Sequence, residues 1–152
     1  MGRLVEKLYT SEILAYTAGL FDGEGCVCLR GIGKYPSLSI DIASTNEAII
    51  LWLQVTFGGS IYRYDNSGRY NRKPSWKWSI GSQEATDFLR LLLPFLRIKK
   101  PQAELGIMFQ TLKRGRHENH REPLSEDVAI AQKEMQEMMR ELNSRGVSYG
   151  RN

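Results

Sequence analysis

The stretch TAGLFDGEG, residues 17–25, joins two kinds of local structure. Thr10 and Ser11 stand before it as helix-capping residues, and an apolar run continues to Phe21, which predicts a helix that the following glycines end. After it, residues 26–30, CVCLR, alternate apolar and polar as a half-buried strand does. A helix, a tight turn with two carboxylates and a strand are therefore expected in immediate succession.

Hairpins and helices alternate along the rest of the chain. The expected elements after the first strand are a strand at 37–43, a helix at 44–57 whose Ser44 and Glu47 have capping-box spacing, a hairpin at 60–80, and helices at 82–93, from Pro101 onward, and at 124–143. This order predicts the α+β class, an αββαββα core in which helices gather on one face of an antiparallel sheet. The other face of the sheet is expected to be polar and basic.

The alternation of apolar and polar residues predicts which face of the sheet each strand residue occupies. Leu38, Ile40 and Ile42 are expected to point inward, which leaves Ser37, Ser39 and Asp41 outward. In the second hairpin, inward Ile61 and Ile80 would place Tyr62, Tyr64, Ser75 and Lys77 outward. The same parity favours a core position for Trp76 and Trp78 over stacking on bases.

Length and charge narrow the functional classes. With 152 residues, 41% of them hydrophobic and 25% charged, the chain fits one domain over residues 1–152. We expect its core at about 10–110 and a helical extension at about 123–143. The net charge of +4 suits an anionic partner, and the segment 60–80 interleaves five basic residues and one acidic residue with aromatic side chains.

The cysteines and the N-terminal segment bear on the compartment. Cys26 and Cys28 have a spacing that cannot close an ordinary disulfide or supply four zinc ligands. They indicate a reducing compartment, the cytoplasm or an organelle matrix. The segment MGRLVEKLYTSE has no apolar h-region and no stretch has the length of a membrane span, so an intracellular, non-secreted protein without a membrane partner is expected. The segment RHENH, residues 116–120, is interpreted as a solvated loop rather than a metal cluster.

Small residues give the first helix a face that a second helix can approach closely. Four residues have this helical spacing: Ala15, Ala18, Gly19 and Asp22. Two copies meeting about a two-fold axis would bring both Gly23-Glu24 turns together. Mg²⁺ takes one or two carboxylates and completes its shell with phosphate oxygens and water, so such a pair of turns suits phosphodiester chemistry. For Asp22 itself, a hydrogen bond to local backbone is favoured over metal ligation.

These motifs together resemble a known family. TAGLFDGEG resembles the signature of the LAGLIDADG homing endonucleases, and the element order resembles that family's core along residues 10 to 110. PFLRIKKPQAEL, residues 94–105, resembles the segment that carries the active-site lysine in single-motif, intron-encoded members. The resemblance implies a homodimer that cleaves double-stranded DNA at a long near-palindromic site, depends on Mg²⁺ or another divalent cation such as Mn²⁺, leaves 3′ overhangs and acts on no small molecule.

The resemblance also assigns roles to individual residues. It implies that Glu24 is the metal-binding carboxylate and that Gly23 contributes its backbone carbonyl. Lys99 would lie near the scissile phosphate, and Asn46 would order active-site water. The chain departs from the family in having Glu24 where Asp is commoner, and Ile50 where relatives often carry a second basic group.

By the same likeness, outward strand residues would read base edges in the major groove, which admits a β-ribbon. These residues are Cys28, Arg30, Lys34, Ser37, Ser39, Asp41, Tyr62 and Lys77. Further DNA contacts, mostly to phosphates, are expected from Arg63, Tyr64, Arg69, Arg72, Lys73, Lys113, Arg114 and Arg116.

Two other functions stay open at this point. The same scaffold could bind without cutting, as an RNA maturase or a DNA-binding regulator, both of which occur in the family. The chain could also be a structural protein that dimerises through the small-residue helix and binds a generic acidic partner. An acid at Glu24 together with a lysine at Lys99 favours cleavage, because binding alone gains nothing from carboxylates placed beside phosphates.

Overall fold

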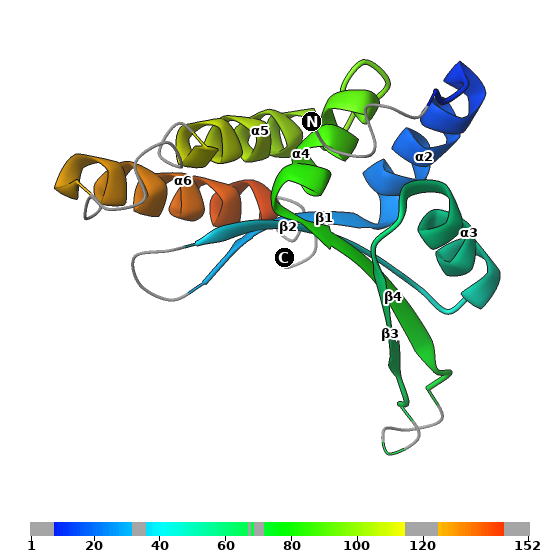
Figure 1. Ribbon diagram of the computed structural model, residues 1–152. Helices are drawn as coiled ribbons and strands as arrows, with labels where there is room; N and C mark the ends of the chain where they lie inside the picture. Colours follow the sequence, from blue (N-terminus) through cyan, green and yellow to red (C-terminus); the bar gives the residue numbers. More distant parts are fainter. Residues whose placement is uncertain (1–7, 32–35, 67, 69–71, 115–124, 145–152) are drawn as a thin grey trace, which may run out of the picture.

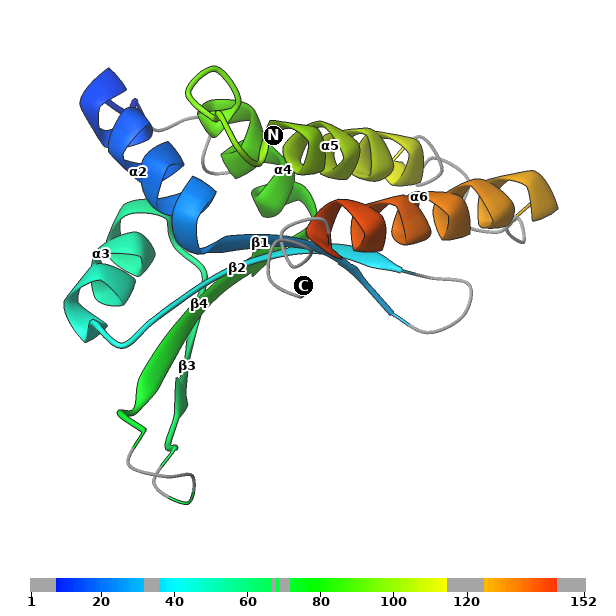
Figure 2. The same cartoon turned by 180° about the vertical axis from the view of Figure 1, so that it is seen from behind.

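An antiparallel sheet with helices on one face organises the protein in the computed structural model (Figure 1). The structure describes residues 8–31, 36–66, 68, 72–114 and 125–144, with the side chain of Arg114 left out. Within these residues the sheet has four strands in the order β1-β2-β4-β3. The view from behind shows the same separation of helices and sheet, with the β3–β4 hairpin reaching away from the helices (Figure 2).

The elements follow the expected order and confirm the α+β class. They are α2 (Ser11–Glu24), β1 (Gly25–Arg30), β2 (Ser37–Ser44), α3 (Glu47–Phe57), β3 (Ser60–Tyr64), β4 (Ser75–Gly81), α4 (Ser82–Leu92), α5 (Lys100–Arg114) and α6 (Glu126–Ser144). None of the helices in the described ranges is long and apolar enough to cross a membrane.

Helix α2 begins as expected and ends later than expected. The Thr10 side chain caps it by accepting a hydrogen bond from the Ile13 amide, at 3.3 Å. The helix then passes through Gly23 to Glu24 instead of ending near Phe21. At Gly25 a Cβ atom would lie 2.3 Å from the Phe21 ring, so only glycine lets the chain leave the helix in contact with that ring.

Helix α3 is capped by a different residue from the one predicted. Asn46 Oδ1 accepts a hydrogen bond from the Ile49 amide at 3.2 Å, while Ser44 Oγ accepts one from the Asn46 amide at 3.0 Å. The Ser44 hydroxyl therefore supports the turn before the helix, and the capping-box prediction was wrong by two positions.

Aromatic side chains fill the space between the helices and β4. The rings of Phe57, Trp78 and Phe88 contact one another, with centroids 5.0 to 6.4 Å apart. Trp78 is fully buried and donates its indole hydrogen bond to the Gly58 carbonyl at 2.6 Å, and Trp76 packs against the same core. The predicted core position of both tryptophans is confirmed.

Helix α6 covers the outer edge of β1. Gln136 Nε2 donates to the carbonyls of Leu29 and Gly31, at 2.9 and 3.0 Å, and Asn143 Nδ2 donates to the Val27 carbonyl at 2.9 Å. An edge strand otherwise presents such carbonyls to other chains. The C-terminal helix, for which the sequence indicated no role, thus supplies hydrogen-bond donors to carbonyls along the edge of the sheet.

Candidate functional site

Asp22 ties the end of α2 to the segment that precedes α5. Its carboxylate accepts hydrogen bonds from the backbone amides of residues 97, 98 and 99, at 2.9, 3.1 and 2.9 Å. In return Lys99 Nζ donates to the Asp22 backbone carbonyl at 3.0 Å. Backbone bonding by Asp22 was expected, but its partners lie 75 to 77 residues away instead of being local.

The start of α5 explains why an acid is suited to this position. The Lys99 carbonyl accepts the first helical hydrogen bond, from the Ala103 amide at 2.9 Å, so Lys99 stands at the helix N-terminus. Backbone amides there have no partner within the helix, and the helix dipole favours a negative charge beside them. The Asp22 carboxylate accepts from the Lys99 amide at this position and from the two amides that precede it, and so fixes Lys99 beside the end of α2.

Glu24 is the last residue of α2 and is exposed, as is Gly23. The last carbonyls of a helix have no intrahelical partner and form the negative end of its dipole, which favours a bound cation. The carboxylate and carbonyl oxygens of residues 22–24 and the Lys99 ammonium group therefore lie at the same end of α2. Among the described residues there is no cluster of three or more His, Cys, Asp or Glu side chains arranged to hold a metal ion. Of the two carboxylates at this end of α2, that of Asp22 is bonded to backbone amides and that of Glu24 is exposed.

The family resemblance singled out Asn46, the N-cap of α3, and Ile50, inside that helix, and their surroundings differ. Asn46 is exposed, with its carbonyl oxygen occupied as the helix cap, and its part in ordering water stays a prediction. Ile50, the position for which the resemblance implied a basic group in relatives, is fully buried in the core. A basic group there would be desolvated among apolar side chains.

The uncovered face of the sheet carries the residues that alternation predicted. Strand register places Cys28 opposite Ser39, and Arg30 opposite Ser37. On the projecting hairpin, Tyr62 pairs with Lys77, whose ammonium nitrogen lies 5.6 and 5.5 Å from the ring centroids of Tyr62 and Tyr64. These contacts hold the lysine charge and two aromatic rings together at the outer face.

Two residues assigned to DNA contact are placed differently. Asp41 lies on the outer face but is only 6% exposed, and its carboxylate is paired with the Arg30 guanidinium. One oxygen of this carboxylate is bound by Arg30 from the neighbouring strand, and the other is buried without a hydrogen-bond partner among the described residues. Arg63 is opposite Trp76 in the register, so its side chain leaves the sheet on the face of the core residues.

Lys113 also lies away from the outer face. It belongs to α5, donates to the Pro36 carbonyl at 3.0 Å, and its pKa is lowered by burial. The structure therefore argues against a phosphate contact by Lys113. Arg72 and Lys73 are exposed beside the end of the β3–β4 hairpin. The predictions for Lys34, Arg69, Arg116 and the side chain of Arg114 lie outside the described residues.

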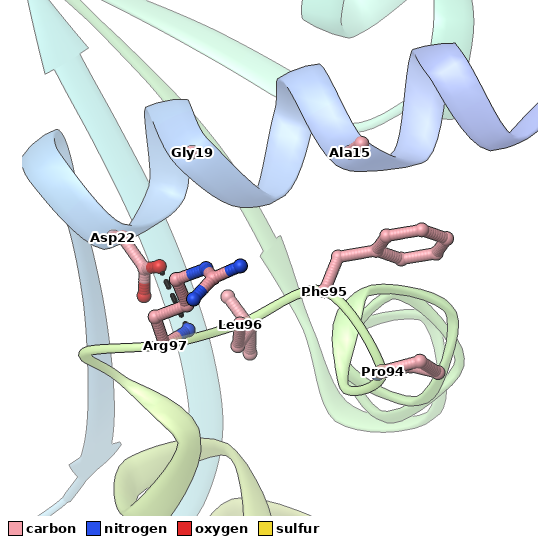
Figure 3. A pocket seen from close by; sticks show the side chains of 7 residues that line it. All are labelled: Ala15, Gly19, Asp22, Pro94, Phe95, Leu96 and Arg97. Atoms are coloured by element: carbon pink, nitrogen blue, oxygen red, sulfur yellow. Dashed lines mark hydrogen bonds between the residues drawn. The ribbon is translucent and has the colours of Figure 1, made fainter.

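The small-residue face of α2 is narrower than predicted. Ala18 is fully buried inside the protomer, so it cannot contact a partner. Ala15 and Gly19 are exposed, and with Asp22 they line a pocket of about 510 Å³ against residues 94–97 (Figure 3). Spacing alone placed Ala18 on this face, because residues at positions i, i+3 and i+4 neighbour one another on a helix surface.

Similar solved structures were found. I-CvuI, a homing endonuclease solved in complex with DNA targets in the presence of calcium or magnesium, superposes with a TM-score of 0.69 at 17% identity over 93% of this chain and 85% of its own. The archaeal intron-encoded homing endonuclease I-Vdi141I, complexed with DNA, gives 0.68 at 12% identity over 93% and 87% of the two chains. The LAGLIDADG meganuclease I-AabMI, bound to uncleaved DNA, gives 0.65 at 16% identity over 81% and 43%.

Comparison by sequence gave no counterpart to these structural similarities. No family model matches the chain, and no curated protein matches it. The shared architecture is nevertheless extensive, since it covers 93% of this chain in the first two of these proteins. This protein has the fold of the LAGLIDADG homing endonucleases.

Proposed function

We propose that this protein is a homodimeric, site-specific DNA endonuclease that depends on a divalent cation. The observation that carries the proposal is the reciprocal contact between Asp22 and Lys99, which binds the Glu24 turn to a lysine from a distant part of the chain. An ammonium group fixed beside an acidic helix end suits a nuclease, which needs a positive charge for the phosphate and oxygen donors for the cation.

Glu24 and the Gly23 carbonyl fit a hard cation. Both offer oxygen donors at the negative end of α2, and Mg²⁺ readily completes such a small set with phosphate oxygens and water. When bound, the cation supplies an activated water and stabilisation of the leaving oxygen. Lys99 contributes a positive charge held in place by the Asp22 carbonyl, and Asp22 keeps that lysine in position through the backbone.

The α2 helix supports a dimer. A Cβ atom built at Gly19 or Gly23 would meet no heavy atom of the described residues within 4 Å, so packing inside the protomer does not require either glycine. Glycine inside a helix costs about 1 kcal/mol relative to alanine. The close approach of a partner helix explains why glycine, and not alanine, stands at both positions. The chain covers only 43% of I-AabMI and 49% of I-GzeII, as expected if two such units complete the site in those proteins.

The sheet supplies the DNA-binding surface in this proposal. No helix within the described residues covers its outer face (Figure 1). The projecting hairpin carries Tyr62, Tyr64 and Lys77, with Arg72 and Lys73 exposed beside its end. Two such sheets about the axis form a saddle that follows the major groove. Strand residues would read base edges while the basic residues would contact phosphates.

The experiment is a selection from randomised duplex DNA for sequences that the purified protein cuts, with Mg²⁺, with Mn²⁺ and without metal. Wild type is compared with Glu24→Gln and with Glu12→Gln, an exposed acid at the other end of the same helix. We expect metal-dependent double-strand breaks with 3′ overhangs for wild type and Glu12→Gln. We expect binding without breaks for Glu24→Gln.

Two outcomes would overturn the proposal. Site-specific binding by wild type without breaks in either metal would assign a non-cleaving binding module. Equal competition by random and selected duplexes would exclude base readout and favour a generic acidic partner.

A further inference from the structure

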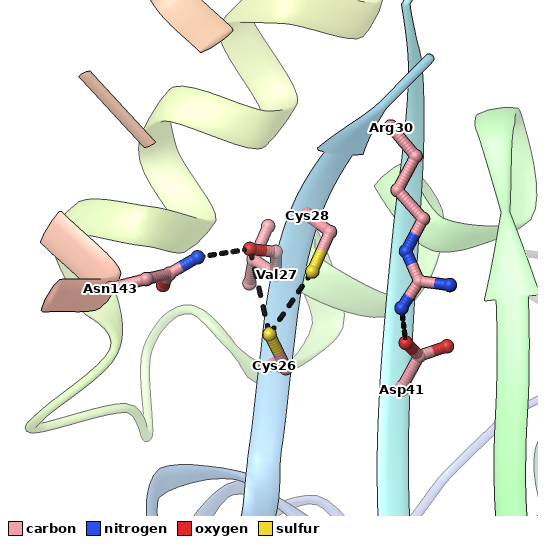
Figure 4. Close-up of polar contacts among 6 residues, drawn as sticks. All are labelled: Cys26, Val27, Cys28, Arg30, Asp41 and Asn143. Carbon is pink, nitrogen blue, oxygen red and sulfur yellow. Dashed lines mark hydrogen bonds and ion pairs between the residues drawn. The ribbon is translucent and has the colours of Figure 1, made fainter. Parts of the chain in front are cut away.

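The outer face of β1 carries two thiols in contact. Cys26 and Cys28 alternate with buried Val27 and therefore share one face of the strand (Figure 4). Their sulfur atoms are 3.1 Å apart, and both side chains are half-buried, so small reagents can reach them. Asp41 lies directly opposite Cys26 on β2 and is paired with Arg30.

The two sulfurs have unequal proton affinities. The hydrogen bond from Cys26, together with the Arg30 guanidinium, lowers the pKa of Cys28 to about 6 despite partial burial. Cys28, beside the Arg30 guanidinium, is therefore the sulfur that carries negative charge more readily, and the Cys26 sulfur lies 3.1 Å from it. A thiolate beside a protonated thiol is the arrangement of a nucleophilic and a resolving cysteine.

We propose that Cys26 and Cys28 form an oxidisable dithiol which peroxides convert to a disulfide within β1, and that this modification weakens DNA binding. The spacing of the two cysteines in the sequence had indicated that they cannot form an ordinary disulfide. Strand geometry puts the two Cα atoms about 6.6 Å apart, at the upper end of the range that disulfides span. The sulfurs already lie close, so a local bend of the strand brings them to bonding distance.

The chemistry balances with a peroxide as the oxidant. The Cys28 thiolate attacks one peroxide oxygen, the O–O bond breaks, and Cys28 becomes a sulfenic acid while the other oxygen leaves as hydroxide or alkoxide and takes up a proton. The Cys26 sulfur then displaces the sulfenic oxygen, its proton leaves with that oxygen as water, and the S–S bond forms. The peroxide accepts two electrons and each sulfur gives up one.

The effect on DNA rests on the proposed function. The disulfide removes the thiolate charge next to Arg30 and bends the strand that carries Arg30. Arg30 lies on the face proposed to read DNA, so its placement over the base edges changes. The bond is reversed by thiol reductants through exchange, which makes the change a switch rather than damage.

The first experiment tests the chemistry without DNA. Wild type, Cys26→Ser and Cys28→Ser are treated with hydrogen peroxide, and intact mass and free thiols are measured before and after dithiothreitol. We expect wild type to lose two hydrogen atoms and both thiols, reversibly. Cys26→Ser should instead give a sulfenic acid that dimedone traps, and Cys28→Ser should react more slowly. A wild type that keeps both thiols, or forms only disulfides between chains, overturns the proposal.

The second experiment measures affinity for a selected duplex with and without peroxide, each variant compared with itself. We expect oxidised wild type to bind several-fold more weakly and to recover with dithiothreitol, whereas Cys26→Ser shows no recoverable change of that kind. Formation of the disulfide with unchanged affinity would refute the switch while leaving the dithiol chemistry in place. Absence of any duplex binding before oxidation would instead count against the proposed function.

Discussion

Asp22 makes contacts that were hard to predict from the sequence and that hold the candidate site together. Its short acidic side chain indicated backbone hydrogen bonding, and that was right. Nothing in the local sequence pointed to residues 97–99, because these amides belong to the segment before α5 and come near Asp22 only in the folded protein. Glu24 and Lys99 were singled out through the family resemblance, and the structure bonds Lys99 to the backbone of Asp22, two residues before Glu24.

Replacing Asp22 with Asn should destabilise the protein by about 1–2 kcal/mol, because hydrogen bonds to a charged group are stronger than neutral ones. Denaturant unfolding measures this change. Glu24→Gln is the matched control, since the exposed Glu24 side chain should change stability by less than about 0.5 kcal/mol. Equal stability of Asp22→Asn and wild type would mean that the three amide contacts contribute little.

Cys28 should make stability depend on pH. Its pKa is lowered from the ordinary 9.0 to about 6 in the folded protein, so between these values the unfolded chain binds more protons than the folded one. The stabilising contribution is therefore complete above pH 9 and decreases as pH falls toward 6. We expect the difference in unfolding free energy between wild type and Cys28→Ser, under reducing conditions, to be larger at pH 9 than at pH 6. A difference that does not change with pH would contradict the thiolate assignment.

At the scale of elements, hydrophobic alternation and capping residues predicted the helices and strands well, and the faces of individual residues less well. Ala18 was expected on the exposed small-residue face but is buried, because only packing decides how far a helix face is covered. Asp41 was correctly placed on the outer face, but its burial depends on Arg30 of the neighbouring strand, a pairing that spacing along the chain does not reveal.

Replacing Gly19, inside α2, or Gly25, directly after it, with alanine should change stability in opposite directions. Gly25→Ala puts a methyl group against the Phe21 ring and should destabilise the fold, by about 1–3 kcal/mol if the ring shifts. Gly19→Ala has open space and should stabilise the helix by about 0.5–1 kcal/mol while weakening self-association. Unfolding of dilute protein and sedimentation measure the two effects separately. Unchanged association of Gly19→Ala would argue against the proposed α2 dimer.

At the scale of the whole molecule, the outer face of the sheet and the basic hairpin predict a binding affinity that depends strongly on salt. Replacing Arg72 and Lys73 with Gln removes two exposed charges at the hairpin end. If both bind phosphates, the slope of log affinity against log salt should fall by about 0.9 for each phosphate that is no longer neutralised. Fluorescence anisotropy over a range of salt concentrations measures the slope. Weaker binding with an unchanged slope would mean that neither residue neutralises a phosphate.

The alternation of residues along β1 and β2 has a consequence for how this protein can change over generations. Val27, Leu38 and Ile40 point into the core, while Cys28, Ser37 and Ser39 between them point away from it. Under the proposed function, mutations at the second set can alter the DNA sequence that is bound without opening cavities in the first. Target preference and folding then depend on different side chains of the same two strands.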